Sequence, residues 1–548
     1  MKILVVGGVA GGMSAAARAR RRNENAEIVV FERGDHPSFA NCGLPYYVSG
    51  EIDDESSLLV QTPESLKSAL DIDVRVRHEV VGVDPTAQTV QVTHDGTTSE
   101  WTYDALILSP GALAVRPPLP GIDSPRVQTL RTVGDAARMR TEVEAGATRA
   151  VVLGAGFIGL EAAEGLRMQG LAVDVVELAP HVLPPLETEQ AALIQAELRE
   201  MGIALHTGVA ATAIESGADA DTVVLADGTR IDADIVVLSV GVRPDTAVFE
   251  AAGVACERGA MIVDGHGRTN LDRIWAVGDA TVSTDSVTGL RRPVALAGPA
   301  NRAGRLVADH IIDPESARPI PQPVGTSIVR VGSLTAAMTG ANRAALDQSG
   351  IDYRTVHLHP GSHAGYFPGA EQIHLVMHLR ADDGLILGAQ AVGSDGADKR
   401  IDVLATAIRN RMTGPDLIDL DLAYAPPYGS AKDPVNMAGM ISENVVSGAL
   451  ELWYADQYNE NESEHLILDV RGPDEQDADP VPGALCIPHT QVRERLTEIR
   501  EAADGRPIRV LCASGVRSYL AYRVLRADGL PAANLSGGLL TLRAYQAG

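Results

Sequence analysis

The sequence predicts an α/β protein that consists of several domains. Because globular domains usually span about 100–200 residues, a chain of 548 residues is expected to form three or four of them. Residues 3–33 and 150–178 repeat one pattern of strand, glycine-rich turn, Ala-rich helix and strand. A small block of alternating strands and helices follows a polar stretch near residues 451–465. Alternating strands and helices of this kind are typical of parallel sheets covered by helices.

The chain is strongly acidic. It has 46 Lys plus Arg against 72 Asp plus Glu, which gives a formal net charge of −26. Such a charge repels nucleic acid and anionic membranes, and no apolar run approaches the roughly 18 residues of a membrane span. We therefore expect no nucleic-acid or membrane partner, and any anionic ligand must meet a local basic patch.

Cysteine usage indicates a reducing compartment. The four cysteines, Cys42, Cys256, Cys486 and Cys512, are scattered and form no CxxC pair. This pattern favours neither a disulfide framework nor a metal site, so we expect a cytoplasmic protein without a bound metal. The N-terminal stretch MKILVVGGVAGGMSAAAR could also be a signal peptide, but its glycines and the strand that follows favour a nucleotide-binding turn.

The first repeat is ILVVGGVAGGMSAAARARRRNENAEIVVFER. Gly7 and Gly12 hold the outer positions of a dinucleotide-binding turn, whereas Val9 replaces the middle glycine. The turn glycines let a helix N-terminus approach a pyrophosphate, and Glu32 at the end of the second strand can bind a ribose hydroxyl, with Arg33 beside it. The alternative is a simple glycine-rich strand-to-helix turn.

The second repeat, AVVLGAGFIGLEAAEGLRMQGLAVDVVEL, is complete. Gly154, Gly156 and Gly159 occupy all three positions, and Glu177 is the acidic residue. A carboxylate there would repel the 2′-phosphate of NADPH, which favours NADH. Two such units in one chain indicate two Rossmann-like domains, one for each dinucleotide.

Cys42 is the first candidate for chemistry. It lies in SFANCGLPYYVSG, just before Pro45, a residue suited to the first turn of a helix. A helix N-terminus would lower the pKa of the Cys42 thiol and make it nucleophilic. The alternative is an inert core cysteine.

With these motifs the chain resembles the pyridine nucleotide-disulfide oxidoreductases over residues 1–448. VGDA at 277–280, with Asp279, is similar to the motif that returns the chain to the FAD site. The resemblance implies FAD and NADH as cofactors and a homodimer with an active site shared between subunits. In the glutathione-reductase branch a second cysteine follows five residues after the first. Here that position is Tyr47, so Cys42 has no partner for an intramolecular disulfide.

SFANCGLPY is similar to the single-cysteine branch, which contains coenzyme A-disulfide reductases, persulfide reductases, and NADH oxidases and peroxidases. Oxidase and peroxidase members typically carry a His in the first glycine turn, where this chain has Ala10. Sulfur substrates are therefore favoured over oxygen or peroxide. A flavin-based redox or sulfur sensor with negligible turnover remains a further alternative.

Several positions match coenzyme A contacts in that branch. YAPPYGSAKDPVNMAG and HAGYFPG supply two tyrosines, which the resemblance places near the redox cysteine of the other subunit, and one lysine. The matching residues are Tyr366, Tyr424, Lys432, Ser38, Asn41, Arg18 and Arg21, with Arg22 on the same helix face. One family position departs: a lysine near the substrate phosphates falls at about Leu70, with Lys67 one turn away.

The C-terminal block resembles rhodanese. CASGVRS at 512–518 puts Cys512 at the end of a strand with Arg517 nearby, and LDVR and NLSGG match flanking segments. Backbone N–H groups curling around the Cys512 sulfur would stabilise a thiolate and a persulfide. A buried structural cysteine is the alternative.

The sequence thus predicts two Rossmann-like FAD and NAD(P) domains, an α+β dimerisation domain and a small α/β rhodanese domain. The expected boundaries are 1–115 and 245–322 for the FAD-binding domain, 116–244 for the NAD-binding domain, 323–448 for dimerisation, 449–463 for a linker and 464–548 for rhodanese. The function expected is NADH-dependent reduction of coenzyme A disulfide or coenzyme A persulfide at Cys42, with Cys512 supplying or accepting sulfane sulfur.

Overall fold

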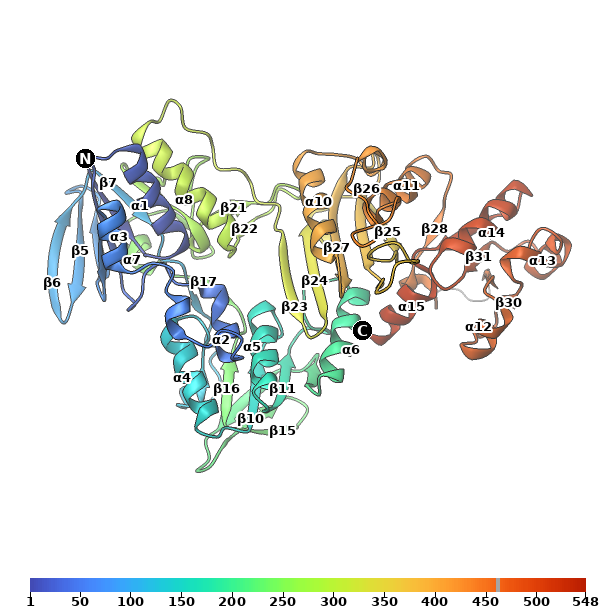
Figure 1. The fold of residues 1–548 in the computed structure, drawn as a ribbon, viewed down its shortest axis with the longest axis horizontal. Coiled ribbons are helices and arrows are strands. Elements are labelled where there is room, and N and C mark those ends of the chain that lie inside the picture. The colour runs from blue at the N-terminus through green and yellow to red at the C-terminus, as the bar shows by residue number, and fades with distance from the viewer. Residues whose placement is uncertain (460–463) are drawn as a thin grey trace. The chain divides into compact units, whose positions relative to one another are not determined.

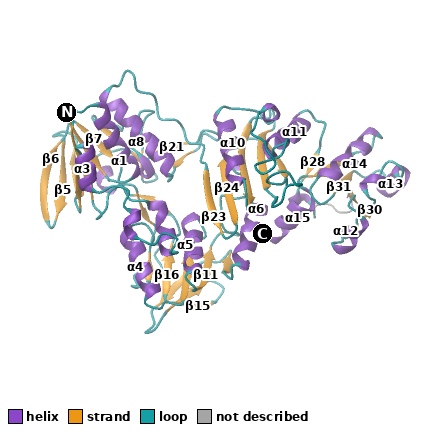
Figure 2. Ribbon diagram, viewed as in Figure 1, coloured by secondary structure: helices purple, strands orange, loops and turns teal. Residues whose placement is uncertain are grey.

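The computed structural model describes residues 1–459 and 464–548, and it confirms the predicted α/β class (Figure 1, Figure 2). The chain divides into two compact units. The first comprises residues 1–179 and 201–325, and the second comprises residues 180–200 and 326–548. Within the described ranges, none of the helices combines the length and apolar character that a membrane crossing requires.

The first unit begins with a five-stranded parallel sheet in the order β20-β7-β1-β2-β3. Its strands are β1 (Lys2–Val6), β2 (Glu27–Glu32), β3 (Asp73–Val76), β7 (Ala105–Leu108) and β20 (Ile274–Ala276). β1 and β7 are apolar and almost wholly buried, as expected for strands covered on both faces. Because β1 connects to β2 on one side and pairs with β7 on the other, the order reverses at β1, where α/β sheets bind ligands.

Helices α1 (Ala10–Arg22), α3 (Pro63–Leu70) and α8 (Ala297–Ile312) belong to this sheet's domain, and α1 and α8 lie side by side (Figure 1). Small apolar residues of α1 and α8 share one core with the sheet. An antiparallel sheet of β4 (Glu79–Asp84), β5 (Thr89–His94) and β6 (Thr97–Thr102) contributes Val80, Val90 and Val92 to a second core.

A second parallel sheet in this unit has the order β12-β11-β10-β16-β9. Its strands are β9 (Val127–Gln128), β10 (Arg149–Leu153), β11 (Ala172–Glu177), β12 (Ala204–Thr207) and β16 (Ile235–Leu238). Helices α4 (Val133–Glu144) and α5 (Phe157–Met168) accompany it, with an antiparallel sheet of β13 (Ala211–Glu215), β14 (Asp221–Leu225) and β15 (Arg230–Ala233). The strand order reverses at β10, which repeats the topology of the first sheet.

The second unit contains an antiparallel sheet in the order β23-β24-β27-β26-β25. Its strands are β23 (Ser327–Val331), β24 (Leu334–Gly340), β25 (Tyr353–Leu358), β26 (His374–Arg380) and β27 (Ile386–Gly393). Helices α9 (Arg343–Ser349), α10 (Ala397–Arg409) and α11 (Pro434–Val446) complete this domain. Helix α6 (Thr188–Glu200) packs here as well, although the sequence placed residues 180–200 inside the NAD-binding domain.

The C-terminal domain has a parallel sheet in the order β28-β32-β31-β29-β30. Its strands are β28 (Leu452–Trp453), β29 (Leu466–Asp469), β30 (Leu485–Cys486), β31 (Ile508–Leu511) and β32 (Ala532–Leu535), with helices α12 (Pro473–Ala478), α13 (Leu496–Ala503), α14 (Val516–Ala527) and α15 (Gly538–Ala547).

The expected linker 449–463 differs from the structure in one respect. Leu452 and Trp453 form strand β28 and pair with β32, because the buried Trp453 completes the apolar core of the C-terminal domain. Residues 460–463 of the expected linker lie outside the described residues.

Candidate active site

The first glycine turn joins β1 directly to α1. A Cβ atom on Gly12 would lie 1.9 Å from the carbonyl oxygen of Gly7, so no larger residue fits there. The Glu32 carboxylate accepts hydrogen bonds from the N–H groups of Gly8 and Gly34, each at 2.7 Å. Arg33 forms an ion pair with Asp245. Glu32 therefore lies at the turn as predicted, whereas the charge of Arg33 is already balanced.

The second turn repeats this geometry between β10 and α5. A Cβ on Gly159 would lie 2.0 Å from the carbonyl oxygen of Gly154, whereas a Cβ on Gly156 would meet no atom within 4 Å. The Glu177 carboxylate accepts hydrogen bonds from Ala155 N at 2.7 Å and Ala179 N at 2.8 Å. The backbone at Gly156, the first residue before the helix, is thus open to a pyrophosphate.

Cys42 lies in a short 3-10 turn, Asn41–Gly43, immediately before α2 (Leu44–Val48), and its side chain is exposed. The loop before it is fixed to the first glycine turn, because Ser38 N donates to the carbonyl oxygen of Gly8 at 2.7 Å. Ser38 and Asn41 therefore flank Cys42 beside that turn.

The electrostatics of Cys42 differ from the expectation. Partial burial and the nearby carboxylates of Glu161 and Asp279 raise the pKa of the Cys42 thiol. The prediction that a helix N-terminus lowers this pKa is wrong, because α2 has only five residues and two negative charges lie close to the sulfur. Glu161 is on α5 and also accepts a hydrogen bond from the Tyr46 hydroxyl at 3.1 Å.

Asp279 follows β20 in a 3-10 turn, Gly278–Ala280. Burial raises the pKa of this carboxyl, and Arg131, 3.6 Å away, opposes that effect. The return segment thereby brings Asp279 to the same end of the sheet as the first glycine turn, because β20 is parallel to β7 and β7 is parallel to β1.

The structure gives Cys42 no partner thiol. All four cysteines are free, and Tyr47 at the expected partner position is a buried aromatic residue stacked on Arg140. Cys42 is therefore not part of a disulfide within this chain.

Tyr366 and Tyr424 meet on the second unit. Their hydroxyl groups are 2.9 Å apart, and the side chains are 75% and 47% exposed. The hydrogen bond with Tyr424 raises the pKa of Tyr366. Two exposed, mutually bonded phenols are suited to contact a substrate or another subunit.

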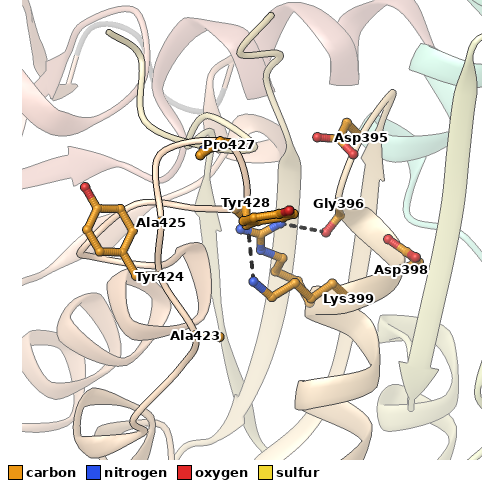
Figure 3. A pocket seen from close by; sticks show the side chains of 10 residues that line it. Asp395, Gly396, Asp398, Lys399, Ala423, Tyr424, Ala425, Pro427 and Tyr428 are labelled. Atoms are coloured by element: carbon orange, nitrogen blue, oxygen red, sulfur yellow. Dashed lines mark hydrogen bonds between the residues drawn. The ribbon is translucent and has the colours of Figure 1, made fainter. Parts of the chain in front are cut away.

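A cavity of about 460 Å³ lies beside this pair (Figure 3). Tyr424, Tyr428, Lys399 and Arg400 line it, and the Tyr424 hydroxyl points away from it. Arg400 is buried and paired with Asp433 at 2.8 Å, and Lys399 donates to the carbonyl oxygen of Tyr428 at 3.4 Å. Lys432 is exposed just before Asp433.

The arginines of α1 face α8. Arg18 pairs with Asp309 at 2.6 Å, and Arg22 lies 3.4 Å from Asp309. Arg21 is exposed and has no ion-pair partner in the described part of the chain. The predicted basic patch is therefore partly neutralised on the α1 side.

Helix α8 contributes two further arginines to this basic patch. Arg302 and Arg305 are exposed and without an ion-pair partner among residues 1–459 and 464–548. Arg305 lies one turn from Asn301, which accepts a hydrogen bond from Ser14 of α1, so it lies near the line of contact between α1 and α8, called here the α1–α8 groove. Sequence reasoning missed both arginines, although their i, i+3 spacing was visible.

The family lysine position is replaced for a structural reason. Leu70 packs against the core under α1, and its carbonyl oxygen accepts a hydrogen bond from the buried Arg20 at 2.8 Å. Lys67 is paired with Asp71. Neither residue provides a free cation near the groove.

Cys512 directly follows β31 and is fully buried. Its sulfur accepts hydrogen bonds from Ser518 N at 3.3 Å and the Ser518 hydroxyl at 3.2 Å. Arg517, one residue earlier on α14, forms two hydrogen bonds with the Glu475 carboxylate, at 2.6 and 2.7 Å. The structure therefore places two donor groups of Ser518 against the Cys512 sulfur and pairs Arg517 with Glu475.

Comparison with protein families identifies the parts. Residues 1–304 match the pyridine nucleotide-disulphide oxidoreductase family, residues 326–434 match its dimerisation domain, and residues 452–544 match the rhodanese-like domain. The chain belongs to the pyridine nucleotide-disulphide oxidoreductase family. Its members are flavin enzymes that use a pyridine nucleotide, and the two glycine turns with Glu32 and Glu177 fit FAD and NADH.

Three relatives of this oxidoreductase are similar over most of their length. The coenzyme A disulfide reductase of Staphylococcus haemolyticus is 35% identical over 449 residues, 80% of this chain and 98% of that protein. The structure of reduced Bacillus anthracis CoADR-RHD is 39% identical with a TM-score of 0.97, covering 99% of this chain and 98% of that one. An NAD-dependent persulfide reductase from A. fulgidus is 36% identical with a TM-score of 0.92, covering 99% and 100%.

The pKa of Cys42 in this oxidoreductase predicts a pH dependence. Because burial, and then the charges of Glu161 and Asp279, raise that pKa, the Cys42 thiolate should form at higher pH than that of an exposed cysteine, and Glu161→Gln should shift the alkylation curve to lower pH. Alkylation of Cys42 by iodoacetamide, followed by mass spectrometry across pH 6–11, measures this shift. Glu100→Gln, which removes a charge from β6, is the control and should leave the curve unchanged; an unshifted curve in Glu161→Gln would contradict the assignment.

Glu177 predicts the choice of nucleotide. Replacing its charge by Glu177→Arg should improve kcat/KM for NADPH relative to NADH by about tenfold or more, because hydrogen bonds to charged groups contribute about 1.5–3 kcal/mol. Anaerobic stopped-flow reduction of the bound flavin by each nucleotide measures the ratio. The same charge change at exposed Asp219 should have no effect, and an unchanged ratio in Glu177→Arg would place the ribose elsewhere.

Proposed function

We propose that this chain forms a homodimeric NADH-dependent flavoenzyme that reduces coenzyme A disulfide or coenzyme A persulfide at Cys42. The observation that supports it most directly is the isolated thiol: Cys42 is exposed, and the buried Tyr47 occupies the position of a partner cysteine. The named relatives are a coenzyme A disulfide reductase and an NAD-dependent persulfide reductase, which match the two proposed reactions. The four free cysteines fit a reducing compartment such as the cytoplasm.

Cys42 performs the sulfur step as a thiolate. With coenzyme A disulfide it attacks one sulfur, one coenzyme A leaves as a thiolate, and a mixed disulfide remains on Cys42. FAD held at the first glycine turn would supply the route for the two electrons of NADH. The overall balance converts one disulfide, one NADH and one proton into two coenzyme A thiols and NAD⁺. With coenzyme A persulfide, the same electrons release sulfide and one coenzyme A.

The two tyrosines assist the leaving group in this proposal. In the dimer, Tyr366 and Tyr424 of the partner subunit stand near Cys42. Their mutual hydrogen bond of 2.9 Å aligns the two hydroxyl groups and leaves a phenolic proton for a departing thiolate. Their exposure on the isolated chain fits residues that are covered only by substrate and a second subunit.

The α1–α8 groove is proposed to bind the phosphates of coenzyme A. Arg21, Arg302 and Arg305 are uncommitted there, whereas Arg18 and Arg22 share Asp309. In a chain of net charge −26, a local excess of arginines is needed to attract a polyanionic substrate. Arg305 thus compensates for the missing lysine at Leu70. Lys432 is proposed as a further coenzyme A contact from the dimerisation domain.

Cys512 is proposed to load sulfane sulfur and transfer it to coenzyme A. The hydrogen bonds from Ser518 to the Cys512 sulfur would equally stabilise a terminal persulfide anion. Transfer converts the Cys512 persulfide and a coenzyme A thiol into the Cys512 thiol and coenzyme A persulfide, which Cys42 then reduces. Tethering raises the effective concentration of one site for the other's product to about the millimolar range.

Anaerobic NADH oxidation by the FAD-loaded enzyme separates the two substrates. We expect faster turnover on coenzyme A persulfide than on coenzyme A disulfide at equal concentration, with one sulfide released for each NADH. Faster turnover on the disulfide would identify a thiol-pool reductase, and NADH consumption that needs only air would identify an oxidase. Cys512→Ser should slow turnover with thiosulfate plus coenzyme A and leave preformed coenzyme A persulfide unaffected.

Arg305→Glu tests the phosphate groove. Removing one charged contact and adding a repulsive charge should raise KM for coenzyme A disulfide about tenfold or more, since a hydrogen bond to a charged group contributes about 1.5–3 kcal/mol. Pantethine, the same disulfide without the nucleotide, should keep its KM. Arg493→Glu makes an equal charge change at an exposed position of the C-terminal domain and serves as control. Equal KM changes for both disulfides would show that Arg305 acts only through the fold.

A further inference from the structure

A buried chain of hydrogen bonds between side chains links three segments that are far apart in sequence. Glu189 of α6, His357 of β25 and Ser536, directly after β32, are 3%, 6% and 2% exposed. Glu189 Oε1 lies 2.8 Å from His357 Nε2, and Ser536 Oγ lies 2.7 Å from His357 Nδ1. All three residues belong to the same compact unit.

The chemistry of the groups fixes the direction of these bonds. A hydrogen bond from His357, together with the charge and the hydrogen bonds of Arg343, lowers the pKa of Glu189 despite its burial, so this carboxylate is ionised and can only accept. Burial lowers the pKa of His357, so the ring is neutral and carries one proton, at Nε2 facing Glu189. Nδ1 is then an acceptor, and the Ser536 hydroxyl donates to it.

Ser536 also accepts a hydrogen bond, from His357 N at 3.2 Å, while Ser536 N donates to the carbonyl oxygen of Trp453 at 3.0 Å. The hydroxyl is therefore held by both the side chain and the backbone of one residue. Arg343 closes the far end of the chain by pairing with Glu189.

The turn that contains Ser536 forms the back of the Cys512 loop. Leu539 N donates to the carbonyl oxygen of Cys512, and Leu540 N donates to that of Ala513, each at 2.9 Å. Asn534 Nδ2 donates to the carbonyl oxygen of Gly515 at 3.1 Å. A shift of residues 534–540 would thus move the backbone that positions the Cys512 sulfur and its donors.

We propose that His357 is a positioning residue for sulfur transfer at Cys512: it fixes Ser536, and through residues 534–540 it holds the Cys512 loop in its reactive geometry. The rhodanese domain then depends on a strand of the dimerisation domain and on α6 for the shape of its active site. The inference rests on the proposed sulfur loading of Cys512 for its consequence, although the geometry it describes is independent of that function.

A neighbouring contact provides a matched control. His359, two residues after His357 in sequence, lies 2.9 Å from the Thr541 hydroxyl of α15. This hydrogen bond joins the same two domains but ends on Thr541, one residue after the segment 534–540, close to Gly537. Thr541→Val therefore removes one interdomain hydrogen bond of the same kind while leaving both hydrogen bonds between His357 and Ser536 in place.

Two substitutions of His357 each keep one of its two side-chain hydrogen bonds and remove the other. Asn places its side-chain oxygen near the position of His Nδ1, so His357→Asn retains an acceptor for Ser536 and loses Glu189. Gln places its amide near the position of Nε2, so His357→Gln retains a donor for Glu189 and loses Ser536. Ser536→Ala removes the hydroxyl alone.

The experiment measures thiocyanate formation from thiosulfate and cyanide by the full-length FAD-loaded protein. We expect His357→Gln and Ser536→Ala to lower kcat about tenfold with KM for thiosulfate within twofold, His357→Asn to recover most of the rate, and Thr541→Val to match the parent. Amide hydrogen exchange at Leu539 and Leu540 should accelerate only in the two impaired variants.

The results test the positioning role of His357 separately from the proposed sulfur loading of Cys512. Parental rates and amide exchange in His357→Gln and Ser536→Ala would overturn the positioning role, as would an equal loss in Thr541→Val, which would show general domain contact. If the parent forms no thiocyanate and Cys512 takes up no sulfur by mass spectrometry, the proposed loading of Cys512 fails. The exchange rates of Leu539 and Leu540 then still decide whether His357 holds the loop.

Discussion

At the start of α1 and of α5, a backbone carbonyl oxygen lies where a Cβ atom would otherwise be. A Cβ atom on Gly12 would lie 1.9 Å from the carbonyl oxygen of Gly7, and a Cβ atom on Gly159 would lie 2.0 Å from that of Gly154. Neither position can therefore hold a larger residue. This close approach lets each helix begin directly at the end of its strand, so that its first N–H groups stand at the edge of the sheet where the strand order reverses. The Cys42 loop depends on the same turn, because Ser38 is bonded to Gly8. The position of the reactive thiol is therefore set by the packing of the first glycine turn.

Local patterns predicted most of this framework, and contacts across long stretches of chain account for what they missed. The turns, Glu32, Glu177 and the Cys512 loop are each specified within about thirty residues, so periodicity and motif spacing suffice. The pKa of Cys42 depends on Glu161 and Asp279, which are more than a hundred residues away in sequence. The pairing of Arg18 with Asp309 likewise spans 291 residues. The two residues of β28, Leu452 and Trp453, were assigned to a linker because the stretch that follows them in the sequence is mostly polar.

The acidity of the chain and its proposed polyanionic substrate are reconciled by local pairing. Asp309 neutralises part of the charge of Arg18 and Arg22, which holds these side chains along the α1–α8 groove, while Arg21, Arg302 and Arg305 keep their full charge toward solvent. The pairing with Asp309 fixes the side chains of Arg18 and Arg22, and the unpaired arginines beside them keep the local electrostatic potential positive. The sequence showed the α1 arginines, but their pairing required the position of α8.

Cys42 and Cys512 lie in different surroundings, which fits the separate roles proposed for them. Cys42 is exposed, and the nearby carboxylates disfavour its thiolate. An exposed thiol suits a bulky substrate, and contacts between that substrate and the arginine patch would supply the binding energy. Cys512 is enclosed by Ser518 and the loop backbone, so it suits a small sulfane donor and a fixed persulfide. A rigid enclosure requires support from behind, and that support comes from residues 534–540, whose Ser536 is held by a strand outside the rhodanese domain. The fusion of the two domains would thus have a structural consequence beyond proximity, because the proposed scaffold of the buried Cys512 thiol is completed by a strand of the dimerisation domain.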